Sequence, residues 1–301
     1  MGMPSDVGAI DLLMGAEIGE ASHALNQQLR DLARDAESKD FFFPAQYMFK
    51  DVPFSSQARG AGTSVEAPPA DIADVLLPAM DRCGVERAMV GVSPTRESGR
   101  RLLQRFPDRF FGSFEVNPND GMDGVRDLVR MYEEHGIKAA TAFPAGFSPQ
   151  VAINDKKMYP LYAKCVELDI PICICAGVPG PRVPFSVQHV ELLDEVCWFF
   201  PELRIVTRHG CEPWTDLAVK LMLKWPNLYY STSAFAPKYY PKDIVEFANT
   251  RGADKEMYAG YFPMGLTLDR IFEELAHVPF RDNVWPKFLR ENALRVFKLD
   301  D

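Results

Sequence analysis

The sequence has no excess of positive charge and few cysteines. It carries 33 lysines and arginines against 42 aspartates and glutamates, so its formal net charge is −9. A protein that binds nucleic acid needs a basic face that neutralises phosphates, and no local cluster of Lys and Arg supplies one. The six cysteines follow no regular spacing, which indicates free thiols in a reducing compartment rather than a disulfide framework. We therefore expect no nucleic-acid partner and a cytoplasmic location.

Long hydrophobic runs are also absent. No apolar run approaches the ~18 residues that a membrane-spanning helix needs. The segment Met1–Asp6 lacks the positive and apolar regions of a secretory signal. Of the 301 residues, 47% are hydrophobic and 25% are charged, which is the composition of an ordinary globular protein. We expect no membrane partner and a single domain over residues 1–301.

Short apolar runs alternate along the chain with stretches of helical period. The predicted strands are Ala9–Leu13, Arg87–Val92, Phe110–Val116, Lys138–Phe143, Ile170–Ala176, Arg204–Arg208, Leu228–Thr232 and Glu256–Tyr261. The predicted helices between them include Ile72–Cys83, Gly124–His135, Lys157–Leu168, Val187–Phe199, Thr215–Lys224 and Pro241–Asn249. Several strands are apolar on both faces, as in a parallel sheet that helices cover.

This alternation indicates an α/β protein built from βα units. Eight such units predict a (β/α)8 TIM-like barrel. A Rossmann-like open sheet is the alternative, but the chain lacks a dinucleotide fingerprint, because its only glycine-rich candidate, Gly60–Gly62, neither follows a strand nor opens a helix.

An insertion after the first predicted strand, residues 15–69, interrupts the pattern. It contains the aromatic runs Phe41–Phe43 and Tyr47–Phe49, followed by a piece rich in Gly, Ser and Pro. Insertions of this kind lie on top of a barrel and often cover the active site. We interpret this one as a lid over the site or as a contact between subunits.

Four motifs, in this order and spacing, carry a resemblance to a known family. They are Pro107–Gly112 at the start of a strand, Met158–Pro171 at a helix and the strand after it, the turn His209–Trp214 and the closing segment Glu291–Leu299. With them the chain resembles the amidohydrolase-2 branch of the amidohydrolase superfamily, which includes the aminocarboxymuconate semialdehyde decarboxylase-like enzymes. Dimers are common in that family, so the resemblance implies a homodimer.

The resemblance also implies that most metal ligands of this family are missing here. Metal-binding members carry two histidines at the end of the first strand, one on the fifth strand and an aspartate on the eighth. The matching positions hold Leu13, Gly15, Cys175 and Tyr261, and only His209 remains. Cys173, Cys175 and His209 could together bind zinc, but buried cysteines more often pack as small hydrophobic residues. We expect no metal and no cofactor.

The candidate catalytic residues lie at the predicted carboxyl ends of strands, where barrel active sites form. His209 can act as an acid or a base near neutral pH. Glu212 could orient His209 or activate water, or it could cap the next helix. Asp11 could assist them, or be a buried structural group. Tyr261 could donate a hydrogen bond to an oxyanion, or only fill the space of a lost ligand.

Two arginines are candidates for binding a substrate carboxylate, because a guanidinium matches its geometry. Arg182 lies in the stiff Pro/Gly loop 177–184. If the strand continues regularly, alternation places Arg208 and His209 on opposite faces, which leaves a structural salt bridge in the barrel wall as the alternative role of Arg208. Three further residues are expected to line the substrate site, namely Trp214, Ser231 and Ser233.

These residues predict a metal-independent hydrolase with a small or medium carboxylated substrate. The enzyme would open a lactone ring or break another activated C–C or C–O bond. Such bonds are reactive enough that a positioned base and oxyanion donors can suffice without a metal. Two alternatives stay open. One is a decarboxylase or hydratase of a ring-cleavage product, and the other is a catalytically inactive barrel that serves as a binding or assembly subunit.

Overall fold

The computed structural model describes residues 2–16, 31–39 and 70–299 of the chain. Eight parallel strands form one sheet in the order β1 to β8. They are β1 (Ala9–Met14), β2 (Val85–Gly91), β3 (Phe110–Glu115), β4 (Ala139–Ala142), β5 (Ile172–Cys175), β6 (Ile205–Arg208), β7 (Leu228–Ser231) and β8 (Glu256–Met257). The order and the parallel pairing confirm the predicted (β/α)8 barrel.

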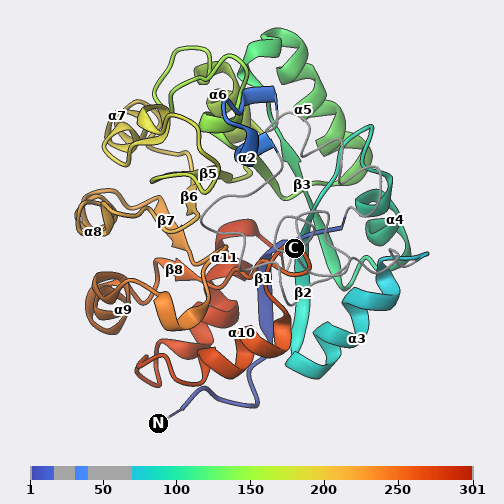
Figure 1. Ribbon diagram of the computed structural model, residues 1–301, viewed down its shortest axis with the longest axis vertical. Coiled ribbons are helices and arrows are strands. Elements are labelled where there is room, and N and C mark those ends of the chain that lie inside the picture. The colour runs from blue at the N-terminus through green and yellow to red at the C-terminus, as the bar shows by residue number, and fades with distance from the viewer. Residues whose placement is uncertain (1, 17–30, 40–69, 300–301) are drawn as a thin grey trace.

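Helices surround the strands (Figure 1). They are α3 (Ala73–Cys83), α4 (Glu97–Arg105), α5 (Met122–His135), α6 (Tyr159–Glu167), α7 (Leu192–Phe199), α8 (Thr215–Lys224), α9 (Lys242–Phe247), α10 (Leu268–Leu275) and α11 (Asn292–Phe297). Within the described ranges, no helix is long and apolar enough to cross a membrane. Of the predicted insertion, the structure describes the short helix α2 (Ala36–Lys39) and its neighbours. Residues 17–30 and 40–69, with both aromatic runs, lie outside the described residues.

The barrel interior is a packed apolar core. Its residues on the strands or directly after them are Ile10, Leu12, Met89, Phe111, Ala139, Cys173, Val206, Tyr229, Met257 and Ala259. Where a strand contributes two of them, they are two residues apart, as expected for side chains that point to the same face. Helix α11 contributes Ala293, Val296 and Phe297 to the same cluster. This helix therefore closes the barrel at the amino-terminal ends of the strands.

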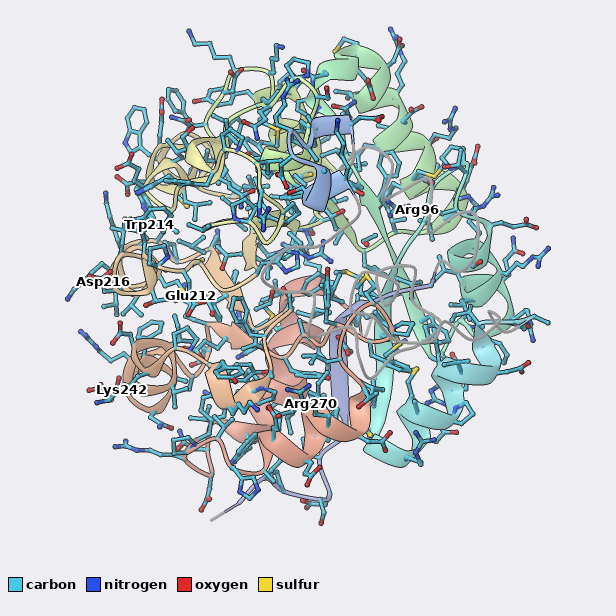
Figure 2. All side chains as sticks on the ribbon, in the orientation of Figure 1. Arg96, Glu212, Trp214, Asp216, Lys242 and Arg270 are labelled. Carbon is cyan, nitrogen blue, oxygen red and sulfur yellow. The ribbon has the colours of Figure 1, made fainter. Side chains whose placement is uncertain are left out.

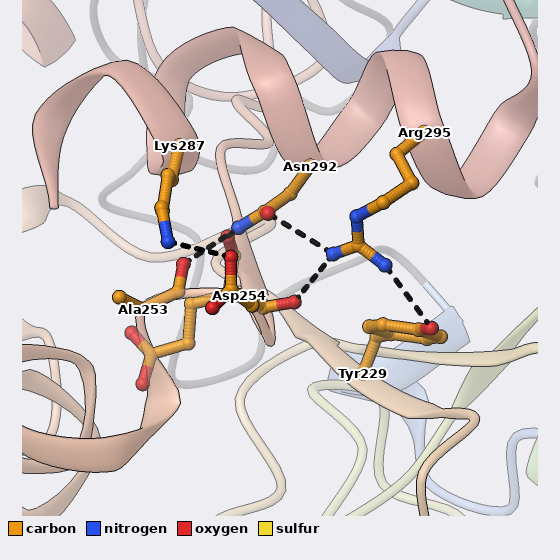
Figure 3. A network of polar contacts seen from close by, with 7 residues as sticks. Tyr229, Ala253, Asp254, Lys287, Asn292 and Arg295 are labelled. Atoms are coloured by element: carbon orange, nitrogen blue, oxygen red, sulfur yellow. Dashed lines mark hydrogen bonds and ion pairs between the residues drawn. The ribbon is translucent and has the colours of Figure 1, made fainter.

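A polar network holds α11 against that closed end (Figure 3). The amide of Asn292 donates to the carbonyl oxygen of Ala253 at 2.8 Å, and Arg295 donates to that of Asp254 at 2.7 Å. Lys287 forms an ion pair with the Asp254 carboxylate at 2.7 Å. These contacts tie α11 and the turn before it to the start of β8, so this end of the barrel serves stability.

The first and last strands meet through a side chain as well as through the backbone. The Leu12 amide donates to the Tyr258 carbonyl oxygen at 3.4 Å, and the Gly260 amide donates to Oδ1 of Asp11 at 2.8 Å. The regular strand β8 ends at Met257, short of the predicted Glu256–Tyr261, because these later residues bond to Asp11 and to the segment before α11 instead of a full ladder. Asp11 therefore joins β1 to the chain beyond β8.

Candidate active site

The turn after β6 brings two candidate residues to the same place. Val206 lies in the interior cluster, so alternation turns Arg208 inward as well. His209 has a φ of 63°, which is the left-handed region, and its ring meets that of Tyr261 edge to face with centroids 6.0 Å apart. The placement of Arg208 and His209 on opposite faces assumed a strand that continues regularly, and β6 ends at Arg208. Alternation holds only for extended residues, and the left-handed backbone turns His209 back toward the barrel mouth.

Ser233 holds His209 at two points. Its hydroxyl oxygen accepts the backbone N–H of His209 at 3.0 Å and lies 3.2 Å from Nδ1 of the ring. Burial, together with the charge of Arg208, lowers the pKa of His209 to about 3. The imidazole is therefore neutral at physiological pH and can accept a proton.

Tyr261 follows β8 and presents a phenol beside His209. Burial raises its pKa to about 12, the thiol of Cys175 acts in the same direction, and the charge of Arg208 opposes both. The hydroxyl keeps its proton at neutral pH and can donate a hydrogen bond to an oxygen on which negative charge develops.

Among the described residues, no hydrogen bond or ion pair of the Arg208 guanidinium is found, although its charge helps to lower the pKa of the buried Asp11 carboxyl. Its neighbour on β5 is Cys175, with which it pairs in register. Burial raises the pKa of Cys175 to about 12 and that of Cys173 to about 11, and the charge of Arg208 opposes the rise in both. Within the described part of the chain, Arg208 thus lies without an ion pair beside the neutral groups of Cys175, His209 and Tyr261.

Asp11 is fully buried and its carboxylate is occupied by hydrogen bonds. Oδ1 accepts the backbone N–H groups of Leu13 at 2.9 Å and Gly260 at 2.8 Å, and Oδ2 accepts the hydroxyl of Tyr258 at 3.3 Å. Burial raises its pKa to about 6, although these hydrogen bonds act in the opposite direction. The geometry fits the structural alternative for this residue.

Glu212 and Trp214 lie in the turn that leads to α8. The carboxylate of Glu212 is partly exposed, bonds to no other described residue, and has a pKa raised by burial. The ring of Trp214 packs at a tilt against His189, with centroids 3.9 Å apart, and against Phe185, with centroids 5.4 Å apart. In Figure 2 both turn residues lie on the opposite side of the barrel from Arg96. Phe185 and His189, which sequence reasoning missed, make Trp214 part of an aromatic cluster on the loop after β5.

The remaining two candidates are engaged with other parts of the protein. Ser231 is buried, and its hydroxyl donates to the carbonyl oxygen of Thr207 at 2.8 Å. Arg182 forms an ion pair with Asp35 at 2.9 Å, which links the loop after β5 to the segment that begins α2. Neither contact brings these side chains together with His209.

Arg96 and Glu115 form a polar pair at the mouth that the sequence analysis missed. Nη2 of Arg96 lies 2.9 Å from Oε2 of Glu115, at the end of β3. The guanidinium passes close over Gly91, where an added Cβ would lie only 2.7 Å from Nη1. Arg96 belongs to no strand, so no periodicity could have placed it over the end of β2.

The residues at the implied metal positions do not form a ligand set. Leu13 packs against the interior core cluster, and Gly15 has no side chain. Across the described ranges, no three His, Cys, Asp or Glu side chains form a group that could hold a metal ion. Cys173, which could have supplied a thiolate, is a member of the apolar core cluster.

Two comparisons bear on the family. A family model described as Amidohydrolase matches residues 67–299, which is most of the chain. Among curated proteins, no relative matches the sequence.

Solved structures share the fold at low sequence identity. An uncharacterized TIM-barrel protein from Bordetella bronchiseptica matches with a TM-score of 0.70 and 20% identity, over 97% of this chain and 99% of that one. A 5-carboxyvanillate decarboxylase from Novosphingobium aromaticivorans, complexed with manganese, matches with a TM-score of 0.66 and 17% identity, over 98% and 97%. A 4-oxalomesaconate hydratase from Rhodopseudomonas palustris matches with a TM-score of 0.62 and 17% identity, over 96% and 95%.

Proposed function

The chain belongs to the amidohydrolase family, and on that premise we propose that it is a metal-independent hydrolase of a small carboxylated substrate. One observation carries the proposal. The neutral imidazole of His209, the protonated hydroxyl of Tyr261 and the guanidinium of Arg208 converge at the carboxyl ends of the strands. A base, an oxyanion donor and a site for an anion are the groups that ester hydrolysis requires.

The geometry supports the following steps for a lactone. In the tautomer of His209 that carries its proton on Nδ1, this N–H donates to Ser233, and the lone pair of Nε2 is free to take a proton from water. The water oxygen attacks the lactone carbonyl carbon, and the hydroxyl of Tyr261 donates to the oxyanion that forms. The ring C–O bond then breaks, and the imidazolium returns its proton to the leaving oxygen. The net change is the addition of one water.

A divalent cation does not fit the residues of this site. The manganese-bound decarboxylase belongs to the same fold, so the question arises for this chain. Leu13 and Gly15 offer no donor atoms, and the described residues contain no group of three His, Cys, Asp or Glu ligands. The charge of Arg208 acts on Cys175, His209 and Tyr261 at the same mouth and would repel a bound cation. We therefore assign the chemistry to side chains alone.

Decarboxylation or hydration of a carboxylated compound is the second candidate. The decarboxylase and the hydratase among the structural neighbours favour it, since their names specify such substrates. In this case His209 would supply or remove the proton at the reacting carbon. The inactive barrel is the third candidate, and Arg208 argues against it, because a cation without an ion pair among the described residues costs free energy when it is turned into the barrel mouth and serves no ligand.

The test is a panel of lactones and unsaturated keto acids, assayed for acid release and for CO2, alongside elemental analysis of protein purified without added metal. We expect acid release without stoichiometric metal and a loss of about 10²- to 10⁴-fold in rate for His209→Ala. His277→Ala, an exposed histidine near α10, is the matched control. CO2 release instead of acid would favour the second candidate, and stoichiometric zinc or manganese would contradict the metal-free mechanism.

A further inference from the structure

The loop after β5 and the turn after β6 are joined through their backbones. The amide of Val178 donates to the carbonyl oxygen of Glu212 at 2.8 Å. Gly177, which has a φ of 102°, lies so close to the turn that an added Cβ would be 2.8 Å from the same oxygen. Loop 177–189 and turn 209–214 therefore form one segment at the carboxyl ends of these two strands, which we call the β5–β6 rim.

Three aromatic rings from both parts of the β5–β6 rim meet. The ring of Trp214 lies 3.9 Å from that of His189 and 5.4 Å from that of Phe185, measured between centroids. Phe185 is 40% exposed although it belongs to this cluster. The buried amide of Gln188 donates to the carbonyl oxygen of Gly177 at 2.8 Å and so ties the far end of the loop to its start. The rim therefore offers aromatic surface to a ligand on a backbone that is already in place.

A carboxylate without a cation lies in the same rim. Glu212 is two residues from Trp214, in a turn closed by the hydrogen bond from the Trp214 amide to the Cys211 carbonyl oxygen at 2.9 Å. Both side chains lie on the same side of the barrel (Figure 2). Burial raises the pKa of the Glu212 carboxyl, and no hydrogen bond or cation in the described part of the chain opposes it. Withdrawing an anion from water without a partner costs free energy, and a cationic ligand would lower that cost.

Aromatic rings and a carboxylate are together the groups that bind an alkylammonium ion. A ring face attracts a cation through its quadrupole, and a carboxylate adds the opposite charge. A neutral apolar ligand would use the rings but leave the carboxylate without a partner. The formal net charge of −9 also favours the approach of a cation over that of an anion.

We propose that the β5–β6 rim binds an alkylammonium group, with Glu212 as its counter-ion and the rings of Phe185 and Trp214 against its methyl or methylene groups. Glu212 lies three residues beyond His209, so their Cα atoms are at most about 11 Å apart and one small molecule can reach both. The inference rests on the proposed function for the role of His209. The hydrolase would then act on a zwitterion whose ammonium group lies at the rim while its carbonyl lies at His209.

The experiment compares choline with 3,3-dimethyl-1-butanol, which has nearly the same shape but no charge. Calorimetry at constant ionic strength measures the affinities, and NMR of protein labelled with ¹⁵N-tryptophan reports the site. The chain has four tryptophans, so the Trp214 indole signal can be assigned from its loss in Trp214→Phe. We expect choline to shift this signal and to bind about fivefold more tightly than the alcohol, or better.

Two variants separate the charge from the rings. Glu212→Gln keeps the shape of the side chain but removes its charge, so it should weaken choline about fivefold and leave the alcohol unchanged. Phe185→Leu keeps an apolar side chain at an exposed position but removes the ring face, so it should weaken choline about 2- to 30-fold. The matched controls are Glu273→Gln, at an exposed carboxylate of α10, and Phe199→Leu, at the exposed end of α7. Both should leave choline binding unchanged.

Equal binding of choline by wild type and Glu212→Gln would overturn the inference. Equal affinity for choline and the alcohol would overturn it as well, and so would the absence of choline binding. In each of these cases, turnover of a lactone that depends on His209 would leave the proposed function intact. Choline binding at the rim without turnover of any lactone would contradict the proposed function instead, so the two failures are distinguishable.

Discussion

The hydroxyl oxygen of Ser233 contacts His209 twice, 3.0 Å from its backbone nitrogen and 3.2 Å from Nδ1 of its ring. A single buried serine, two residues beyond the end of β7, thus holds both the left-handed backbone and the ring orientation of the candidate base. A left-handed non-glycine residue is strained, so it persists only where such contacts hold it.

We expect Ser233→Ala to lower kcat about tenfold, a small part of the 10²- to 10⁴-fold that acid–base catalysis contributes. The substitution frees the imidazole but leaves the substrate's carboxylate site intact, so KM should change little. Steady-state kinetics on the lactone that gives turnover measures both values. Ser113→Ala, at another buried serine on a barrel strand, is the control. A change confined to KM would contradict the orienting role of Ser233.

Arg208→Gln should raise the pKa of His209. Burial is the main cause of its low value of about 3, and the charge of Arg208 is the second. With that charge removed, the imidazole should titrate at a higher pH, closer to its ordinary value of 6.5. An NMR titration of the ¹⁵N-labelled ring measures the shift. An unchanged titration would show that the guanidinium does not face the imidazole.

Asp11→Ala should destabilise the protein more than Asp11→Asn. Alanine leaves the buried N–H groups of Leu13 and Gly260 without an acceptor, at a cost of about 1–3 kcal/mol for each. Asparagine keeps an oxygen for both. Denaturant unfolding measures the difference, and activity assays of the folded Asn variant separate the roles. Near-normal activity of Asp11→Asn supports a structural group, while a loss comparable with that of His209→Ala would make Asp11 catalytic.

Glu256→Gln should remove a pH-dependent loss of stability. Glu256 is fully buried, its carboxylate oxygens have no hydrogen-bond partner among the described residues, and burial raises its pKa well above 4.5. The folded state therefore holds a proton that the unfolded state releases above pH 4.5, so stability is full below that pH and falls as the pH rises toward the folded pKa. Each unit of difference is worth about 1.4 kcal/mol.

Unfolding free energies of wild type and Glu256→Gln between pH 4 and pH 8 test this prediction. The variant should show a flatter profile and gain on the wild type as the pH rises. Parallel profiles would mean that Glu256 ionises in the folded protein.

The fold could be predicted because its signals are local and periodic. The buried run that becomes β5 and the regular βα spacing follow from which residues must leave water. The arrangement of the site depends instead on single backbone angles. At His209 the left-handed φ reverses the prediction from alternation, and no periodicity signals it.

Contacts between side chains that are far apart in the chain could not be predicted from the sequence either. Arg96 and Glu115 meet only because α4 begins beside the end of β3, and the pairing of Arg182 with Asp35 joins segments that are far apart in the chain. The resemblance identified His209 and the positions of Tyr261 and Cys175, but it could not say that Arg208 would be the charge left among them.

The barrel closes where β1 meets β8 and the residues that follow it. Elsewhere the strands are joined by ladders of peptide hydrogen bonds, whereas here the contacts are two peptide hydrogen bonds, from Leu12 to Tyr258 and from Gly15 to Phe262, and a carboxylate that accepts the Gly260 amide. Such a closure contains fewer bonds that must break together, so the barrel should open here before it opens elsewhere. Tyr261 is the next residue along the chain from Gly260. The proposed oxyanion donor is thereby attached to the part of the barrel wall that should open first, and local opening would move it away from His209, which the turn after β6 holds.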